Sequence, residues 1–225
     1  MRHRMDGTIS ACGFASGDRV VVGLWEATPI GPMADVMWAE PDGTRTLFAP
    51  TGAVAAFVTA VYDFDAVVVG PLVAEGDATT ARVRIGDVHG AGERTVVMAT
   101  AAGWRIPPAR RPPALTRWVE APLARALLGV RTHGTSPHGV HEWYQATAWR
   151  PVVAARGTVD GHDLGALSPI DPPCRFGFSE PPPRPSITAV RPLLEDPSGA
   201  LDRLVVDLRA GVPVEVLSPD PPPHP

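Results

Sequence analysis

Alternation of apolar and polar positions dominates the chain and predicts a β-rich fold. In the segment 81–85, Arg82 and Arg84 alternate with Val83 and Ile85, which is the two-residue period of a strand with one buried face. The turn sequence at 41–43, Pro-Asp-Gly, predicts a hairpin between the strands on either side of it. By the same criteria we expect strands at 19–25, 35–40, 44–48, 66–73, 95–100, 141–149, 152–159, 175–178 and 187–194.

Two segments favour helices. Valine and phenylalanine recur over 54–61 at the i, i+3, i+4, i+7 spacing of a helix, and Thr51 is positioned as its N-cap. A second short helix is predicted over 122–128, with proline in its first turn and glycine after its end. The segment 201–208 fits a helix and a hairpin. Its paired valines and the Gly-Val-Pro turn at 211–213 favour the hairpin.

Together these elements predict an α+β, β-dominated fold: a single curved antiparallel sheet or barrel-like β domain with about two short helices. The chain has 225 residues, of which 44% are hydrophobic, enough for one domain with a substantial core. We expect a flexible N-terminus over 1–9, one globular domain over 10–217 and a disordered proline-rich tail over 218–225. Met1 and Met5 both fit as the start of the protein.

The composition removes several classes of function. All 20 basic residues are arginine and there is no lysine, so a lysine Schiff base and a Walker-type phosphate loop are excluded. The net charge of −4 indicates no basic face for nucleic acid, and we expect no such partner. No G-x-G-x-x-G, G-x-S-x-G or C-x-x-C motif occurs. We therefore predict no cofactor, and the sequence assigns no catalytic residue.

The sequence also predicts a soluble, cytoplasmic protein. No signal peptide is recognisable and no apolar run approaches the length of a membrane span, so we expect no membrane partner. The two cysteines, Cys12 and Cys174, are too few for a disulfide framework and are expected as free thiols. Nothing in the sequence indicates an oligomeric state.

Three histidines, His133, His138 and His141, lie close together in the sequence. Imidazoles are common ligands of transition metals, but this spacing matches no known ligand set. His141 and Glu142 are neighbours on a predicted strand, so they point to opposite faces and cannot share one ion. We therefore predict no metal site, and we interpret these histidines as solvated side chains of a loop.

The predicted strand 141–149 carries the candidate ligand-binding face. Large aromatic walls with a few polar groups are typical of ligand pockets, although they are equally typical of a tryptophan-rich core layer. We expect this face to look into the interior, with the alternating phenylalanines of 175–178 nearby. The candidate ligand-binding residues are His141, Trp143, Gln145, Trp149, Phe176 and Phe178.

Parts of the chain resemble an uncharacterised protein family of high-GC bacteria. The matching stretches run from Ser10-Ala11-Cys12-Gly13-Phe14 to Val36-Met37-Trp38-Ala39, and from His141-Glu142-Trp143-Tyr144 through Asp163-Leu164-Gly165-Ala166-Leu167 to Arg175-Phe176-Gly177-Phe178-Ser179. This resemblance implies no known activity. The order of elements is also similar in layout to acetoacetate-decarboxylase-like folds, which are β-rich cone-shaped barrels around a cavity. That family acts through a Schiff-base lysine, so the likeness implies the fold without the chemistry.

Three hypotheses of function follow. The first is a small-molecule-binding or orphan enzymatic domain with an interior aromatic-lined cavity. The second is a non-catalytic interaction or scaffold protein, and the third is a His-dependent metalloenzyme. A deep closed pocket would favour the first, and a flat exposed apolar patch would favour the second.

Overall fold

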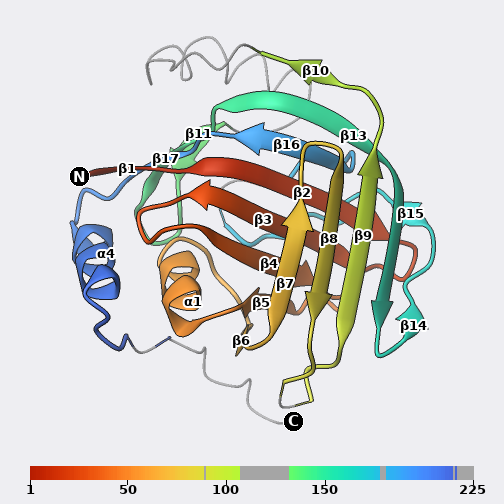
Figure 1. The fold of residues 1–225 in the computed structure, drawn as a ribbon, viewed down its shortest axis with the longest axis horizontal. Coiled ribbons are helices and arrows are strands. Elements are labelled where there is room, and N and C mark those ends of the chain that lie inside the picture. The colour runs from red at the N-terminus through yellow and green to blue at the C-terminus, as the bar shows by residue number, and fades with distance from the viewer. Residues whose placement is uncertain (89, 107–131, 178–180, 215, 217–225) are drawn as a thin grey trace.

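The computed structural model describes residues 1–88, 90–106, 132–177, 181–214 and 216, and within them the fold is β-dominated (Figure 1). Strands hold 48% of these residues and two helices hold 10%. The prediction of an α+β fold built on a strongly curved sheet is therefore confirmed. No helix in the described part of the chain is long and apolar enough to cross a membrane.

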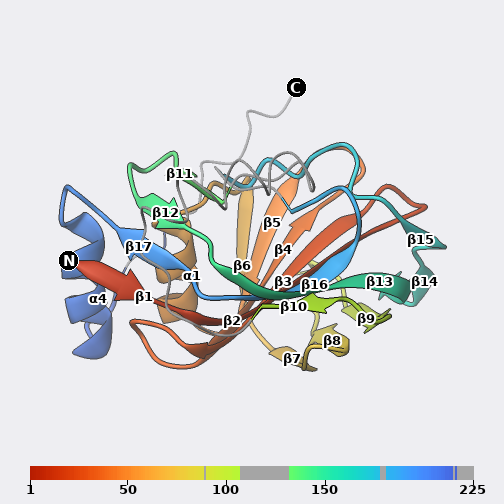
Figure 2. The same cartoon turned by 90° about the horizontal axis from the view of Figure 1, so that it is seen from above.

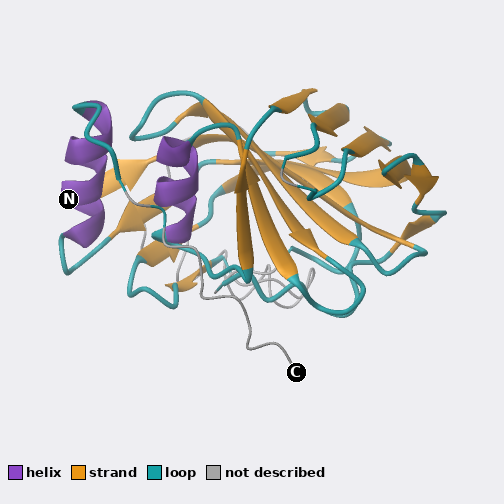
Figure 3. Ribbon diagram, turned by 90° about the horizontal axis from the view of Figure 1, so that it is seen from below, coloured by secondary structure: helices purple, strands orange, loops and turns teal. Residues whose placement is uncertain are grey.

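A large curled sheet forms the body of the molecule (Figures 1 and 3). Along the sheet, its main strands are β6 (Ala66–Val69), β5 (Arg45–Ala49), β4 (Met33–Ala39), β3 (Arg19–Ala27), β2 (Asp6–Phe14), β16 (Ser186–Val190), β13 (Ala146–Val159), β9 (Arg94–Thr100), β8 (Thr80–Ile85) and β7 (Leu72–Gly76). Three short strands lie off this path: β10 (Trp104–Arg105) and β14 (His162–Asp163) pair with β13, and β15 (Leu167–Ser168) pairs with β2. Among these pairs β5 and β6 are parallel, and the others are antiparallel.

The two ends of this sheet are neighbours in sequence. β6 and β7 stand at opposite ends of the strand order, yet only Gly70 and Pro71 separate them in the chain. The sheet must therefore curl until its ends approach each other, and β7 packs against β3 and β4. The apolar faces of β2–β5, β8, β9, β13 and β16 enclose the first core cluster, which contains Val22, Trp38, Phe48, Met98 and Ile187.

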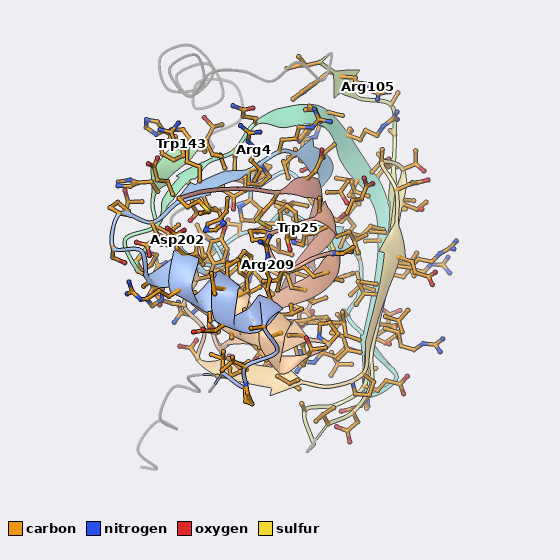
Figure 4. All side chains as sticks on the ribbon, turned by 60° about the vertical axis from the view of Figure 1, so that its left-hand side comes forward. Arg4, Trp25, Arg105, Trp143, Asp202 and Arg209 are labelled. Atoms are coloured by element: carbon orange, nitrogen blue, oxygen red, sulfur yellow. The ribbon has the colours of Figure 1, made fainter. Side chains whose placement is uncertain are left out.

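A second, smaller sheet and both helices stand at one end of the molecule (Figure 2). Its strand order is β1 (Arg2–Arg4), β17 (Leu193–Glu195), β12 (His141–Trp143) and β11 (His133–Thr135), all antiparallel. Helix α1 (Gly52–Thr59) begins where the Thr51 side chain accepts a hydrogen bond from the Val54 amide, which confirms the predicted N-cap. Helix α4 (Ala200–Arg209) carries Asp202 in its first turn and Arg209 as its last residue (Figure 4). The acidic residue lies at the positive end of the helix dipole and the basic residue at its negative end, so both charges are favourable.

Several predicted elements need correction. The segment 201–208 is a helix rather than a hairpin, because Leu201 and Val205, four residues apart, both bury against the third core cluster beside α1. The segment 66–73 is two strands, interrupted at Gly70-Pro71, and its side chains are half-buried or exposed. The segment 187–194 is interrupted in the same way at Arg191-Pro192. In each interruption proline lacks the N–H that a continuous ladder requires.

Four other predicted segments are 1–9, 122–128, 175–178 and 218–225. Residues 1–9, expected as a flexible segment, contribute β1 and the first part of β2, with His3 and Met5 buried. In the predicted strand 175–178, the described residues 175–177 form a loop in which Arg175 adopts a φ of 60°, and Phe178 lies outside the described residues. The predicted helix at 122–128 and the tail at 218–225 lie outside the described residues.

Candidate functional site

The predicted strand 141–149 crosses from the small sheet to the large one. It breaks at Tyr144 and Gln145, between β12 and β13. Gln145 and Trp149 are buried as expected, but in β12 the fully buried residue is Glu142. The expected inward face is therefore wrong in β12. The reason is the register with β17, which places Glu142 opposite Leu194, a residue of the third core cluster.

His141 and Trp143 lie on the opposite, outer face of the small sheet. Both are half-buried, their ring centroids are 6.1 Å apart, and Trp143 stands at the rim of the molecule in Figure 4. His133 pairs with Trp143 across β11 and β12. Nδ1 of His141 hydrogen-bonds Oγ1 of Thr135 at 3.0 Å. The face is a mixed polar and aromatic surface rather than an enclosed pocket.

The remaining candidate residues lie apart from His141 and Trp143. Trp149 is buried with its indole N–H unpartnered among the described residues, and the Arg184 guanidinium lies 5.3 Å from its ring centroid. Phe176 packs on Phe64, with ring centroids 5.7 Å apart, and Phe178 lies outside the described residues. Nε2 of His138 pairs with Asp63 at 2.9 Å. Within the described part of the chain no group of three or more potential ligands is placed to hold a metal ion.

A cluster around Glu142 joins three polar side chains from distant parts of the sequence. The Tyr62 hydroxyl donates a 2.9 Å hydrogen bond to Oε2 of Glu142, and it also forms a very short hydrogen bond with the Tyr144 hydroxyl. Oε1 of Glu142 has no hydrogen-bond partner among the described residues. Tyr62 follows α1, and Tyr144 stands at the break between the two sheets. Both tyrosines of the protein therefore meet at one buried carboxyl group.

Burial controls the protonation of this cluster. It raises the pKa of Glu142 to about 7, although the hydrogen bonds from Tyr62 and Tyr144 act in the opposite direction. Burial also raises the pKa of both tyrosines well above 10, and the negative charge of Glu142 adds to this. Both hydroxyls therefore keep their protons at neutral pH, while the carboxyl group populates its acid and base forms together.

A second buried carboxyl group belongs to Asp35 on β4, which is 2% exposed. The Trp25 indole N–H donates to its Oδ1 at 2.8 Å, and its Oδ2 has no partner among the described residues. Burial raises the pKa of Asp35 to about 7 against the opposing effect of the Trp25 hydrogen bond. Gly23, opposite Asp35 in the β3–β4 register, provides the space for this pair.

Asp35 belongs to the same electrostatic environment as Glu142. Its negative charge contributes to the raised pKa of Tyr144, which is itself hydrogen-bonded within the Glu142 cluster. No basic side chain among the described residues contributes to the shifted pKa of Asp35 or of Glu142. We call Asp35, Tyr62, Glu142 and Tyr144 the buried acidic site. It combines two carboxyl groups that titrate near neutrality with two permanent hydroxyl donors, which suits binding and proton transfer.

No protein-family model matches this chain, and no curated protein or solved structure is significantly similar to it.

The loop that contains Phe176 supports the buried acidic site from one side. A Cβ atom on Gly177 would lie 2.5 Å from Cδ1 of Tyr62, so the loop backbone packs directly on the tyrosine ring. The carbonyl of Phe176 accepts a 2.8 Å hydrogen bond from the amide of Asp63, the residue after Tyr62. Phe176, selected from the sequence as a ligand contact, thus belongs to a segment that fixes Tyr62.

Sequence reasoning missed the four residues of the site, although signals for them existed. Asp35 is a single acidic residue inside the otherwise apolar strand Met33–Ala39, where an unpaired carboxylate has a high cost. Glu142 was assigned to the face opposite the aromatic residues because a uniform period of two was extended through the break at 144–145. Tyr62 and Tyr144 are 82 residues apart, and no local pattern connects them.

Proposed function

We propose that the protein binds a small molecule at the buried acidic site and acts on it by acid–base catalysis, with Glu142 as the group that carries the proton. The observation that supports this most directly is the state of its carboxyl group. Glu142 is fully buried, Tyr62 holds Oε2, and Oε1 is unpartnered among the described residues. A buried polar atom without a partner is costly for stability, and a ligand that supplies the missing contact would remove this cost.

The neighbouring residues have distinct parts in this proposal. Tyr62 and Tyr144 stay protonated. The Tyr62 hydroxyl orients the carboxyl group through Oε2 and is itself bonded by the Tyr144 hydroxyl, which leaves Oε1 available to the reacting atom. A catalytic group works best when its pKa lies near the operating pH, because both of its protonation states are then accessible. A pKa of about 7 for Glu142 meets this condition at neutral pH.

The two other hypotheses have less support. Exposed valines on the outer sheet surface are interrupted by arginines, since Val97 pairs with Arg82 on one side and Arg156 on the other. A continuous apolar docking patch is therefore not favoured. For a metalloenzyme, His138 and His141 already have partners, Asp63 and Thr135.

We retain a cytoplasmic location as part of the proposal, together with the absence of a nucleic-acid partner. Cys12 and Cys174 form no disulfide and are both buried, as expected for a protein that needs no oxidising compartment. The interior aromatic-lined cavity likewise stays a prediction.

A thermal-shift screen of metabolite-like compounds at pH 7 tests the proposal. Three proteins are compared: the wild type, Glu142→Gln, and Glu75→Gln, which removes the same charge from the exposed strand β7. We expect compounds that stabilise the wild type and the Glu75 variant but not the Glu142 variant, and turnover of these compounds is then assayed. If every stabilising compound acts equally on Glu142→Gln, or if none stabilises the wild type, the proposal is wrong.

A further inference from the structure

We infer that a second binding site lies around Trp149 and takes a small organic oxyanion, a carboxylate or a phosphate monoester that carries a flat apolar body. The site consists of Trp149 on β13, Trp104 on β10, Thr188 on β16 and Arg184 in the segment before β16. This inference goes beyond the proposed function and does not depend on Glu142.

Strand pairing and one measured distance bring these four side chains together. Trp149 stands opposite Trp104 in the β10–β13 register and opposite Thr188 in the β13–β16 register. Directly opposite residues point to the same face of a sheet, so the three side chains form one row, and Figure 1 shows β10 beside β13. The Arg184 guanidinium lies 5.3 Å from the ring centroid of Trp149. The indole is therefore bordered by a second indole, a hydroxyl group and a cation.

The indole N–H of Trp149 lacks the acceptor that a buried tryptophan normally has. Trp149 is 8% exposed, and its Nε1 has no partner among the described residues. By contrast, the indole N–H of Trp38 donates to Asp18 at 2.7 Å, and that of Trp25 donates to Asp35 at 2.8 Å. The protein thus supplies a carboxyl oxygen to two other indoles. Because an indole nitrogen only donates, the group that Trp149 lacks is a hydrogen-bond acceptor.

Arg184 brings a positive charge to the same ring. Its side chain is exposed, and within the described part of the chain it contacts the Trp149 ring without forming an ion pair or a hydrogen bond. The carbonyls of its two neighbours, Pro183 and Pro185, each accept a backbone hydrogen bond, at 2.8 and 2.9 Å. These bonds fix the segment, so the guanidinium is held in place before a ligand arrives. The planar guanidinium binds two oxygens of a carboxylate or a phosphate at once.

The indole N–H and the guanidinium call for the same kind of ligand. Both are donors beside one ring, so a single oxyanion can accept from both, and the positive charge of Arg184 disfavours a cation. Trp104, opposite Trp149, is 37% exposed. Its exposed indole offers a surface on which a flat apolar group can stack. An oxyanion without such a group would leave this surface in water, so the ligand is an organic oxyanion rather than an inorganic one.

Titration of the full-length, nitrogen-15-labelled protein, followed by NMR of the indole N–H signals, tests this inference. The probes are phenylacetate and phenyl phosphate, with benzylamine and benzyl alcohol as cationic and neutral controls and acetate as an oxyanion without a ring. We expect phenylacetate, phenyl phosphate or both to bind and to move the Trp149 signal downfield. The signal is assigned by its loss in Trp149→Phe. Acetate should bind at least tenfold more weakly, and the cationic and neutral controls should leave the signal in place.

Two variants and a matched control decide which side chains hold the ligand. Arg184→Gln should weaken binding at least tenfold, and Trp104→Ala should remove the preference for phenylacetate over acetate. Arg82→Gln, which changes an exposed arginine on β8, should bind as the wild type does. Both Arg184 and Trp104 are exposed, so their variants should fold, and circular dichroism checks this.

Several results would overturn the inference. It is wrong if neither aromatic oxyanion moves the Trp149 signal, if a cationic or neutral control or acetate binds as tightly, or if Arg184→Gln binds as the wild type does. When both aromatic oxyanions bind, the tighter of the two shows whether the natural ligand is a carboxylate or a phosphate monoester.

Discussion

The indole N–H of Trp25 donates a 2.8 Å hydrogen bond to Oδ1 of Asp35, and the two bonded groups occupy the space where a side chain on Gly23 would stand. Trp25 and Gly23 belong to β3, and Asp35 lies opposite Gly23 on β4. Two neighbouring strands thus contribute three residues to hold one carboxyl group inside an apolar layer. A valine at position 35 would satisfy packing alone, so the apolar layer does not itself require a carboxyl group here.

Gly23→Ala should disrupt this arrangement. The new Cβ would stand 2.4 Å from Oδ1 of Asp35 and 2.4 Å from Nε1 of Trp25, so one group has to move. We expect a loss of about 1–3 kcal/mol in the free energy of unfolding, measured by urea denaturation. Gly52→Ala is the control, because the nearest atom to its Cβ is 4.0 Å away and the residue starts α1. An equal loss in both variants would contradict the explanation.

Arg94→Ala should be among the more destabilising single changes. The buried guanidinium lies 4.7 Å from the Trp38 ring centroid and 4.9 Å from that of Phe48, and it bonds Glu40. The change removes these contacts and leaves Glu40 unpaired, which should cost about 3 kcal/mol or more in urea denaturation. Arg82→Ala, an exposed arginine on β8, should change stability by less than about 0.5 kcal/mol. A loss below 1 kcal/mol for Arg94→Ala would show that the stacked guanidinium contributes little.

Local patterns predict the elements whose partners are close in sequence. The alternation of Arg82 and Arg84 with Val83 and Ile85 matches β8 because one face of that strand is buried and the other exposed. The hairpin of β4 and β5 and the cap at Thr51 are equally local. The sequence does not predict helix α4, because Leu201 and Val205 are buried by contacts with α1 and the small sheet. No local pattern shows that these elements lie beside them.

The site depends on contacts that no local pattern contains. β12 turns Glu142 inward because β17, more than 50 residues later, fixes its register, and β17 in turn pairs with β1 at the start of the chain. A shift by one residue moves every side chain of a strand to the other face, so this long-range pairing decides whether Glu142 or Trp143 is buried. The alternation expected over 141–149 agrees with the burial of Gln145 and Trp149, but it places Glu142 on the opposite face from the one observed.

Asp35→Asn should stabilise the protein at pH 8 and have little effect at pH 4. The folded-state pKa of about 7 lies above the ordinary value of 3.8, so the folded protein binds a proton that the unfolded chain has lost between these pH values. The contribution of Asp35 to stability is therefore fully present below about pH 4 and is lost as the pH rises through 7. Asn keeps the acceptor for Trp25 and avoids the buried charge, so the gain at pH 8 should reach a few kcal/mol.

The control for Asp35→Asn is Asp77→Asn, which should show the opposite pH dependence. Hydrogen bonds from Thr79 and Thr80 lower the pKa of exposed Asp77 to about 2, so its contribution is present above about pH 4 and is lost as the pH falls through 2. Urea denaturation from pH 3 to pH 8 measures both variants. If the difference between Asp35→Asn and the wild type is the same at pH 4 and pH 8, Asp35 does not titrate near neutrality.

Tyr62→Phe should raise the pKa of Glu142 further above 7. The phenol donates a 2.9 Å hydrogen bond to Oε2, and this bond favours the charged carboxylate against the effect of burial. Hydrogen bonds to charged groups contribute about 1.5–3 kcal/mol, so the midpoint of the Glu142 titration should move up by roughly one pH unit or more. Carbon-13 NMR of labelled glutamate side chains follows this titration directly, and Glu142→Gln identifies the signal by its disappearance.

The same variant separates two roles of Tyr62. If the phenol tunes the proton affinity of Glu142, the pH dependence of any Glu142-dependent ligand or reaction should move upward together with the NMR midpoint. If Tyr62 serves only to fill space between α1 and the loop at Gly177, phenylalanine should preserve both the midpoint and the pH profile, since the ring that packs on Gly177 is unchanged. The hydroxyl is the single group removed, so a shared shift assigns the effect to the hydrogen bond with Glu142 rather than to packing.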